Sequence, residues 1–205
     1  MIFGLYYNTP LIDGCRGSEM VRRFSQFMLE RLGVEKAEAA RSTGDQRLRV
    51  TLIARQTRFR RIVNEAELVA ALEETGLYKV TVARFSPQVP FISQLSLTAG
   101  TDILAGLHGA GLTHLLFLPD WAEVVEIYNC DDTHCYQDLA RLVQLAQAKL
   151  SKDRHSLPYW SSLTTSLKLF CHVLNLFCAK IARSGLHHSR MGGRGPADQS
   201  RGPWG

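Results

Sequence analysis

Short apolar runs of strand length alternate with amphipathic segments over residues 47–146. Runs rich in β-branched residues at 47–54, 79–85, 102–107 and 123–128 predict four strands, and the apolar residues that follow each run recur at helical spacing. Regular alternation of strand and helix with short connections is typical of an α/β fold. We therefore expect a parallel Rossmann-like sheet with helices on both faces.

Capping residues indicate where several of the predicted helices begin and end. Ser18 is a typical N-cap residue, and Gly33 stands where a helix-terminating glycine belongs. Asn64, with Glu67 three residues later, makes a capping-box pattern, and Gly76 ends that helix. Together with the apolar spacing, these residues predict helices over residues 19–32, 64–76, 90–100 and 133–146.

The stretch ILAGLHGAGLTHLLFLP, residues 103–119, combines strand, loop and helix signals. An apolar run leads into His108 and the turn Gly109-Ala110-Gly111, and a second apolar run at helical spacing follows. Small residues in such a turn let a ligand approach the backbone, and N–H groups at a helix start face anions. Thr113 adds a hydroxyl. A Gly-x-Gly turn also serves plain strand-to-helix geometry, so this motif alone leaves both interpretations open.

The carboxyl ends of the predicted strands gather the residues that carry chemistry. Arg55 and Arg58 follow the first strand, His108 follows the third, and Glu126 lies near the end of the fourth. Ligands of open parallel sheets bind at this edge. Arginines, a glycine loop and a carboxylate on one edge suit a nucleotide diphosphate whose ribose needs a hydrogen-bond acceptor.

The positive charge of the chain is concentrated in one segment. The formal net charge is +5 and the isoelectric point is near 9.1. Residues 41–61 hold seven arginines against the single acidic residue Asp45, a local balance of +6. Such a local cluster favours a compact polyanion over a long nucleic acid. We therefore expect no nucleic-acid partner.

Three motifs together resemble glycosyltransferase family sixty-one. They are the R-x-x-R segment at 55–58, Asn64-Glu65 opening the next helix, and HGAGLTHLLFLP at 108–119 ahead of the last predicted strand. The resemblance covers residues 1 to about 142. It implies one half of a two-domain (GT-B type) inverting enzyme of the endoplasmic reticulum lumen. Such an enzyme moves N-acetylglucosamine from UDP-GlcNAc to Ser or Thr of EGF-like domains of extracellular proteins.

The resemblance also implies roles for the site residues. Arg55 and Arg58 would hold the diphosphate, the loop from His108 to Gly111 would form the floor of the donor pocket beside Thr113, and Glu126 would meet the nucleoside. The catalytic base is expected in the preceding half, outside this chain. A divalent metal is compatible with the complete enzyme, but no metal site is expected here. A non-catalytic nucleotide-sugar-binding fragment is the alternative function.

The histidines and cysteines near the site leave two further interpretations. His108 and His114 with Cys130, His134 and Cys135 have the spacings H-x5-H and C-x4-C, which are not those of standard zinc sites. Cys130 and Cys135 are placed to close a small loop disulfide in an oxidising compartment. The sequence permits that disulfide without demonstrating it.

Residues 1–46 are expected to form an N-terminal strand and helix with a linker, residues 47–150 the nucleotide-sugar-binding domain, and residues 151–205 a divergent C-terminal extension. Apolar residues from Leu163 to Ile181 recur at steps of three and four, which predicts an amphipathic helix. Composition predicts disorder from about residue 184.

Neither end of the chain carries a recognisable targeting signal. The N-terminal residues MIFGLYYNTPLID lack the basic and apolar regions of a signal peptide, and the C-terminus reads Gly-Pro-Trp-Gly instead of a KDEL-type retention tetrapeptide. Only 11 residues separate Lys168 from Lys180, and a membrane span needs about 20 mostly apolar residues. We therefore expect no transmembrane segment.

Overall fold

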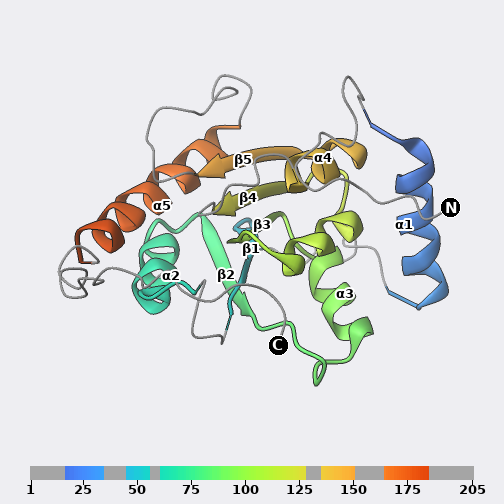
Figure 1. Ribbon diagram of the computed structural model, residues 1–205, viewed down its shortest axis with the longest axis horizontal. Helices are drawn as coiled ribbons and strands as arrows, with labels where there is room; N and C mark the ends of the chain where they lie inside the picture. Colours follow the sequence, from blue (N-terminus) through green and yellow to red (C-terminus); the bar gives the residue numbers. More distant parts are fainter. Residues whose placement is uncertain (1–16, 35–44, 56–60, 128–134, 151–163, 185–205) are drawn as a thin grey trace, which may run out of the picture.

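The computed structural model describes residues 17–34, 45–55, 61–127, 135–150 and 164–184 (Figure 1). Several sequence-based expectations lie outside these ranges. They are the N-terminal strand at residues 2–7, most of the linker, Arg58, Cys130, His134 and the tail beyond residue 184.

Five parallel strands form one sheet in the described part of the chain, in the order β2-β1-β3-β4-β5. Every neighbouring pair is parallel, so all five carboxyl ends meet at the same edge. This confirms the prediction of a parallel α/β fold. The strands are β1 Leu48–Ile53, β2 Tyr78–Ala83, β3 Ile103–Leu107, β4 Glu123–Ile127 and β5 Ala146–Leu150.

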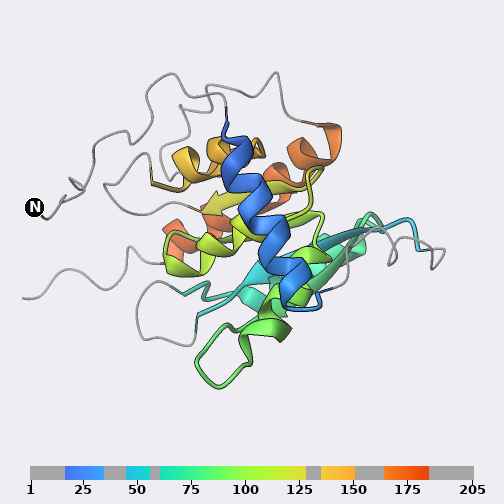
Figure 2. The ribbon, with the colours of Figure 1, turned by 90° about the vertical axis from the view of Figure 1, so that its right-hand side faces the viewer.

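Helices cover both faces of the sheet (Figure 1). On one face, α2 (Glu65–Glu74) and α5 (Thr165–Ser184) pack against apolar residues of β1, β3 and β4. On the other face lie α4 (Cys135–Leu142) and η2 (Ala110–Phe117). Here α3 (Phe91–Ala99) packs beside η2, and α1 (Glu19–Arg31) lies across the outside of both (Figure 2).

The sequence prediction was wrong at the end of α4. The expected helix to Ala146 stops at Leu142, and β5 begins at Ala146. Gln144 has φ 60°, and the N–H groups of Gln144 and Leu145 bond to the carbonyls of Arg141 and Ala140. These bonds form a Schellman motif, usually built on glycine. The strand AQAKL has little intrinsic β-propensity, so pairing along β4 makes it a strand.

The helix-capping predictions have mixed outcomes. The Ser18 hydroxyl accepts a hydrogen bond from the Val21 N–H at 3.4 Å, which confirms the start of α1. Asn64 is the N-cap of α2, but its side chain makes no capping hydrogen bond, so the capping-box prediction was wrong. The helix predicted at the glycine turn is a 3-10 helix, which begins at Ala110 within that turn.

The first half of α5 belongs to the same core as the sheet. Leu167, Phe170 and Leu174 are buried, and the Phe170 ring meets Tyr78 edge-on with centroids 5.4 Å apart. The Thr164 hydroxyl, just before the helix, donates to the Glu123 carboxylate at 2.9 Å. Within the described residues, no helix is long and apolar enough to cross a membrane.

Candidate functional site

The carboxyl ends of β1, β3 and β4 bring three of the predicted site residues to one edge of the sheet. Ile53 of β1 is level with Gly106 of β3, which is level with Glu126 of β4. Arg55 follows two residues after Ile53, and His108 follows two residues after Gly106. The strand register therefore determines which side chains meet here.

The Arg55 guanidinium lies directly against Gly109. Gly109 has φ 149°, which few residues other than glycine adopt. A Cβ atom added there would lie 1.6 Å from Nη2 of Arg55 and 2.6 Å from its Cζ. Because Gly109 has no side chain, the Arg55 guanidinium lies against the loop backbone at the start of η2.

A buried hydrogen-bonded pair lies beneath this loop. Nδ1 of His108 and Oε1 of Glu126 are 2.5 Å apart. The second carboxylate oxygen, Oε2, accepts a hydrogen bond from Nε2 of Gln147 on β5 at 3.0 Å. The residues are 7% (His108) and 2% (Glu126) exposed. Glu126 therefore has both oxygens bonded within the protein, beside the histidine that it holds.

Two more contacts hold His108 in place. Its backbone N–H donates to the Ile127 carbonyl at 3.0 Å, which extends the pairing of β3 with β4 by one step. The Tyr136 ring of α4 meets the imidazole edge-on, with centroids 5.0 Å apart. The imidazole is thus held by groups from β4 and α4, and Gln147 of β5 bonds to the carboxylate beside it.

The remaining loop residues have local structural roles. The Thr113 hydroxyl donates to the Ala110 carbonyl at 2.7 Å, within η2. A Cβ at Gly111 would lie 3.0 Å from Cγ2 of Ile53, so this glycine lets η2 pack closely on β1. Gly109 and Gly111 therefore allow close contacts with Arg55 and Ile53, independently of any ligand that the loop binds.

Two of the seven clustered arginines are ion-paired away from this edge. Arg47 pairs with Asp45 at 2.9 Å and lowers the pKa of that carboxyl to about 2. Arg49 donates from its backbone N–H and its guanidinium to Asp102, each bond 2.9 Å. The Trp121 indole also donates to Asp102 at 3.0 Å. The sequence offers no signal for this network, because its members pair only once β1 and β3 are in register.

Asp102 and His114 show opposite effects of burial on ionisation. Burial raises the pKa of Asp102, but the hydrogen bonds from Arg49 and Trp121 outweigh it and hold that pKa below its usual value. Burial lowers the pKa of His114, whose ring nitrogens lie 3.0 Å from the Gly111 carbonyl and from Oε1 of Gln94. Among the described residues, no three His, Cys, Asp or Glu side chains converge as a metal site would require.

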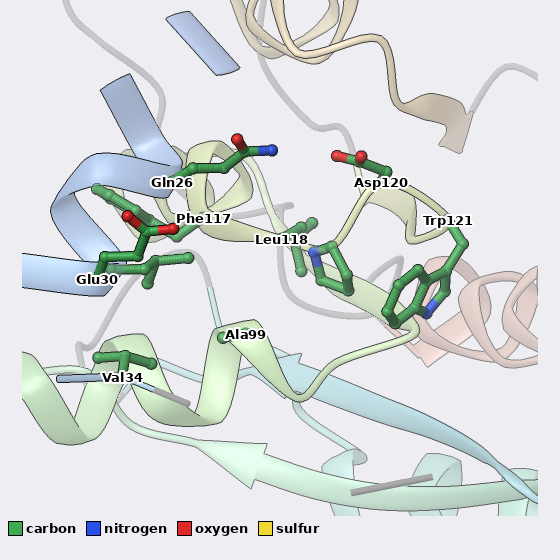
Figure 3. Close-up of a pocket in the computed structure, with 10 residues that line it drawn as sticks. Gln26, Glu30, Val34, Ala99, Phe117, Leu118, Asp120 and Trp121 are labelled. Atoms are coloured by element: carbon green, nitrogen blue, oxygen red, sulfur yellow. The ribbon is translucent and has the colours of Figure 1, made fainter. Parts of the chain in front are cut away.

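A cavity of about 150 Å³ lies at a different place (Figure 3). Gln26 and Glu30 of α1 border one side, and Trp121 and Asp120 of the connection to β4 border the other (Figure 3). Because this connection precedes β4, the cavity is at the amino ends of the strands. It contains none of the predicted donor-site residues.

The family to which the chain belongs follows from a match to a known sequence model. The model described as Glycosyltransferase 61 matches residues 7–125, more than half of the chain. The chain belongs to this glycosyltransferase family. The matched range contains the glycine loop and Arg55, and it ends one residue before Glu126.

Two curated members of the family are similar over most of this chain. The EGF domain-specific O-linked N-acetylglucosamine transferase of Drosophila melanogaster is 50% identical over 142 residues, which are 69% of this chain and 26% of that protein. The protein of the same name from Xenopus laevis is 52% identical over 143 residues, again 69% and 26%. The chain thus matches about a quarter of the length of these relatives.

A solved structure gives a much weaker likeness. A diflavin flavoprotein A3 from Nostoc sp. aligns with 69% of this chain and 98% of its own, at 13% identity and a TM-score of 0.40. That score is too low to support an argument about fold or ligand.

Proposed function

We propose that the chain is the donor-binding part of a transferase that moves N-acetylglucosamine from UDP-GlcNAc to Ser or Thr of EGF-like domains. The supporting observation is the Arg55 guanidinium seated on Gly109, at the carboxyl edge of a parallel sheet. A second support is that 69% of the chain is about half identical to proteins named EGF domain-specific O-linked N-acetylglucosamine transferase.

The geometry suits the departure of a nucleotide diphosphate. An arginine fork binds phosphate oxygens through two parallel hydrogen bonds, and its charge stabilises the negative charge that develops on a leaving UDP. The Gly109 backbone lies beside that fork, so the same ligand would meet the loop and Arg55 together. His108 would contact the same ligand from below the loop. Arg58, which lies outside the described residues, is proposed as the second arginine that binds the diphosphate.

The donor-binding part would be one half of a two-domain GT-B enzyme. Met20, Phe24 and Phe27 of α1 are each more than half exposed and follow one another at helical spacing. An apolar stripe of this kind is typical of a surface that another domain covers. The acceptor-binding part and the catalytic base would then lie in the additional length of the relatives. Because EGF-like domains belong to extracellular proteins, the reaction is proposed for the endoplasmic reticulum lumen.

Calorimetric titration of the full chain with UDP and UDP-GlcNAc tests the donor site. We expect saturable binding by the wild type and a loss of at least about tenfold in affinity for Arg55→Ala, because one charge-assisted bidentate contact is removed. Arg55→Lys keeps the charge without the fork and should recover only part of the affinity. Arg23→Ala, on the exposed face of α1, is the matched control. Absent UDP binding by a folded wild type, or equal binding by Arg55→Ala, would overturn the proposal.

A non-catalytic donor-binding fragment is the second candidate, because the match covers only about a quarter of the length of each of these relatives. Both candidates bind UDP-GlcNAc, and only the first supports transfer once the acceptor-binding part and the catalytic base are supplied. Incubation of the chain, joined to the part of the Drosophila relative that it does not match, with radiolabelled UDP-GlcNAc and a folded EGF-like domain separates them. Label on the EGF-like domain supports the transferase, and UDP-GlcNAc binding without label supports the fragment.

A further inference from the structure

One face of the sheet carries a line of three polar side chains across neighbouring strands. Gly106 is level with Glu126, and His108 lies two residues further along on the same face. Val124 is level with Gln147, and Glu126 lies two residues further along on that face. The line therefore runs from His108 through Glu126 to Gln147, joined by hydrogen bonds of 2.5 and 3.0 Å.

Glu126, in the middle of this line, is buried at a position where an ionised carboxylate without hydrogen-bond partners would cost free energy. Glu126 is 2% exposed, and an ionised carboxylate at such a position needs hydrogen bonds to both oxygens. His108 supplies one bond and Gln147 supplies the other. Oε1 of Gln147 is buried and has no hydrogen-bond partner among the described residues. The amide orientation is thus set by Glu126.

This arrangement determines where the imidazole carries its proton. An ionised carboxylate only accepts hydrogen bonds, so Nδ1 of His108 must donate to Oε1 of Glu126. The tautomer of a histidine is set in this way by the partner of one nitrogen, and the other nitrogen then acts on the ligand. With Nδ1 donating to Glu126, Nε2 is unprotonated, and the ring would meet a ligand as a hydrogen-bond acceptor through Nε2.

We propose that Glu126 and Gln147 are positioning residues, which hold His108 with its proton on Nδ1 and present Nε2 as a hydrogen-bond acceptor to a hydroxyl group of the nucleotide-sugar donor. This inference rests on the proposed function for the presence of that donor. It reassigns Glu126 from contact with the nucleoside to support of His108. It also adds β5 to the site through Gln147. This residue lies beyond residues 7–125, the range that the family model matches.

Three variants separate the geometry of the line from its charge. Glu126→Ala removes the partner of Nδ1. Glu126→Gln keeps it, since the new amide can accept from Nδ1 and donate to Oε1 of a rotated Gln147. Gln147→Met removes the donor to Oε2 at nearly constant volume. Glu74→Gln, exposed on α2, is the matched control for loss of a carboxylate.

Nitrogen-15 NMR of the histidine rings in the full chain tests the inference without ligand, with the His108 signals identified by their loss in His108→Asn. We expect a protonated Nδ1 in the wild type, Glu126→Gln and the control. In Glu126→Ala the proton should move toward Nε2, which free histidine favours. In UDP-GlcNAc titrations, Glu126→Ala should lose at least about tenfold in affinity, Gln147→Met about threefold, and Glu126→Gln less than Glu126→Ala.

Unprotonated Nδ1 in wild-type His108 would overturn the inference, as would UDP-GlcNAc affinity unchanged in both Glu126→Ala and Gln147→Met. The ligand-free spectra distinguish this failure from that of the proposed function. If Nδ1 is protonated as expected but the folded wild type binds no UDP, the proposed function fails, and the positioning role toward a donor fails with it. Circular dichroism of each variant checks that the fold is retained.

Discussion

Replacing Gly109 with alanine tests whether this residue supports Arg55 or only turns the chain. Gly109 has φ 149° and ψ 172°, a region open essentially to glycine alone. An added methyl group would also occupy the place of Arg55 Nη2, 1.6 Å away. The Arg55 side chain is long enough to move aside, so the main energetic cost is backbone strain.

The expected loss of folding stability for Gly109→Ala is about 2 kcal/mol, from the strain of a non-glycine residue in this region. For a domain of this size, that corresponds to a fall of about 4–8 °C in Tm. UDP affinity should fall together with stability, because the methyl group displaces the guanidinium from the loop. Urea denaturation and calorimetry measure the two effects separately.

Gly76→Ala is the control for strain without contact. Gly76 also has a positive φ, 71°, but a Cβ there would meet nothing within 4 Å. It should cost about 1 kcal/mol of stability and leave UDP affinity unchanged. The reasoning is refuted if Gly109→Ala keeps wild-type stability to within about 0.5 kcal/mol. It is also refuted if both variants bind UDP equally well.

Two further predictions concern buried carboxylates. Asp102→Asn should cost about 2 kcal/mol in urea denaturation, because it weakens the bidentate partner of the half-buried Arg49. Since the pKa of Asp102 is held below its ordinary value, its contribution is present above about pH 4 and is lost as the pH falls through the folded pKa, a loss that the variant should not show. Burial raises the pKa of Glu123, so the folded state binds its proton more tightly than the unfolded chain does. Stability should therefore fall as pH rises from the ordinary value of 4.5 through the folded pKa, and Glu123→Gln, which keeps a partner for Thr164, should flatten that slope in denaturation curves measured across pH. An unchanged slope would contradict the burial argument.

Much of the candidate site could be located from sequence. Apolar runs ending at Arg55, His108 and Glu126 predicted strands whose carboxyl ends meet, and the structure places these ends at one edge. The individual roles stay predictions. The structure adds that Glu126 lies beneath the loop, with both oxygens bonded to His108 and Gln147. No spacing in the sequence relates Glu126 to Gln147, because the two meet only when β4 pairs with β5.

Local patterns determined the succession of β1 to β4 along the chain, the start of α1 and the glycine turn at 109–111. Apolar spacing, helix caps and backbone freedom act within a few residues, so the sequence shows them directly. The tertiary structure decided the rest. It made AQAKL a strand through pairing with β4, and it joined Arg49 to Asp102 across 53 positions of the chain. Such contacts depend on the register of distant strands, which burial of two opposed apolar faces selects only in the folded protein.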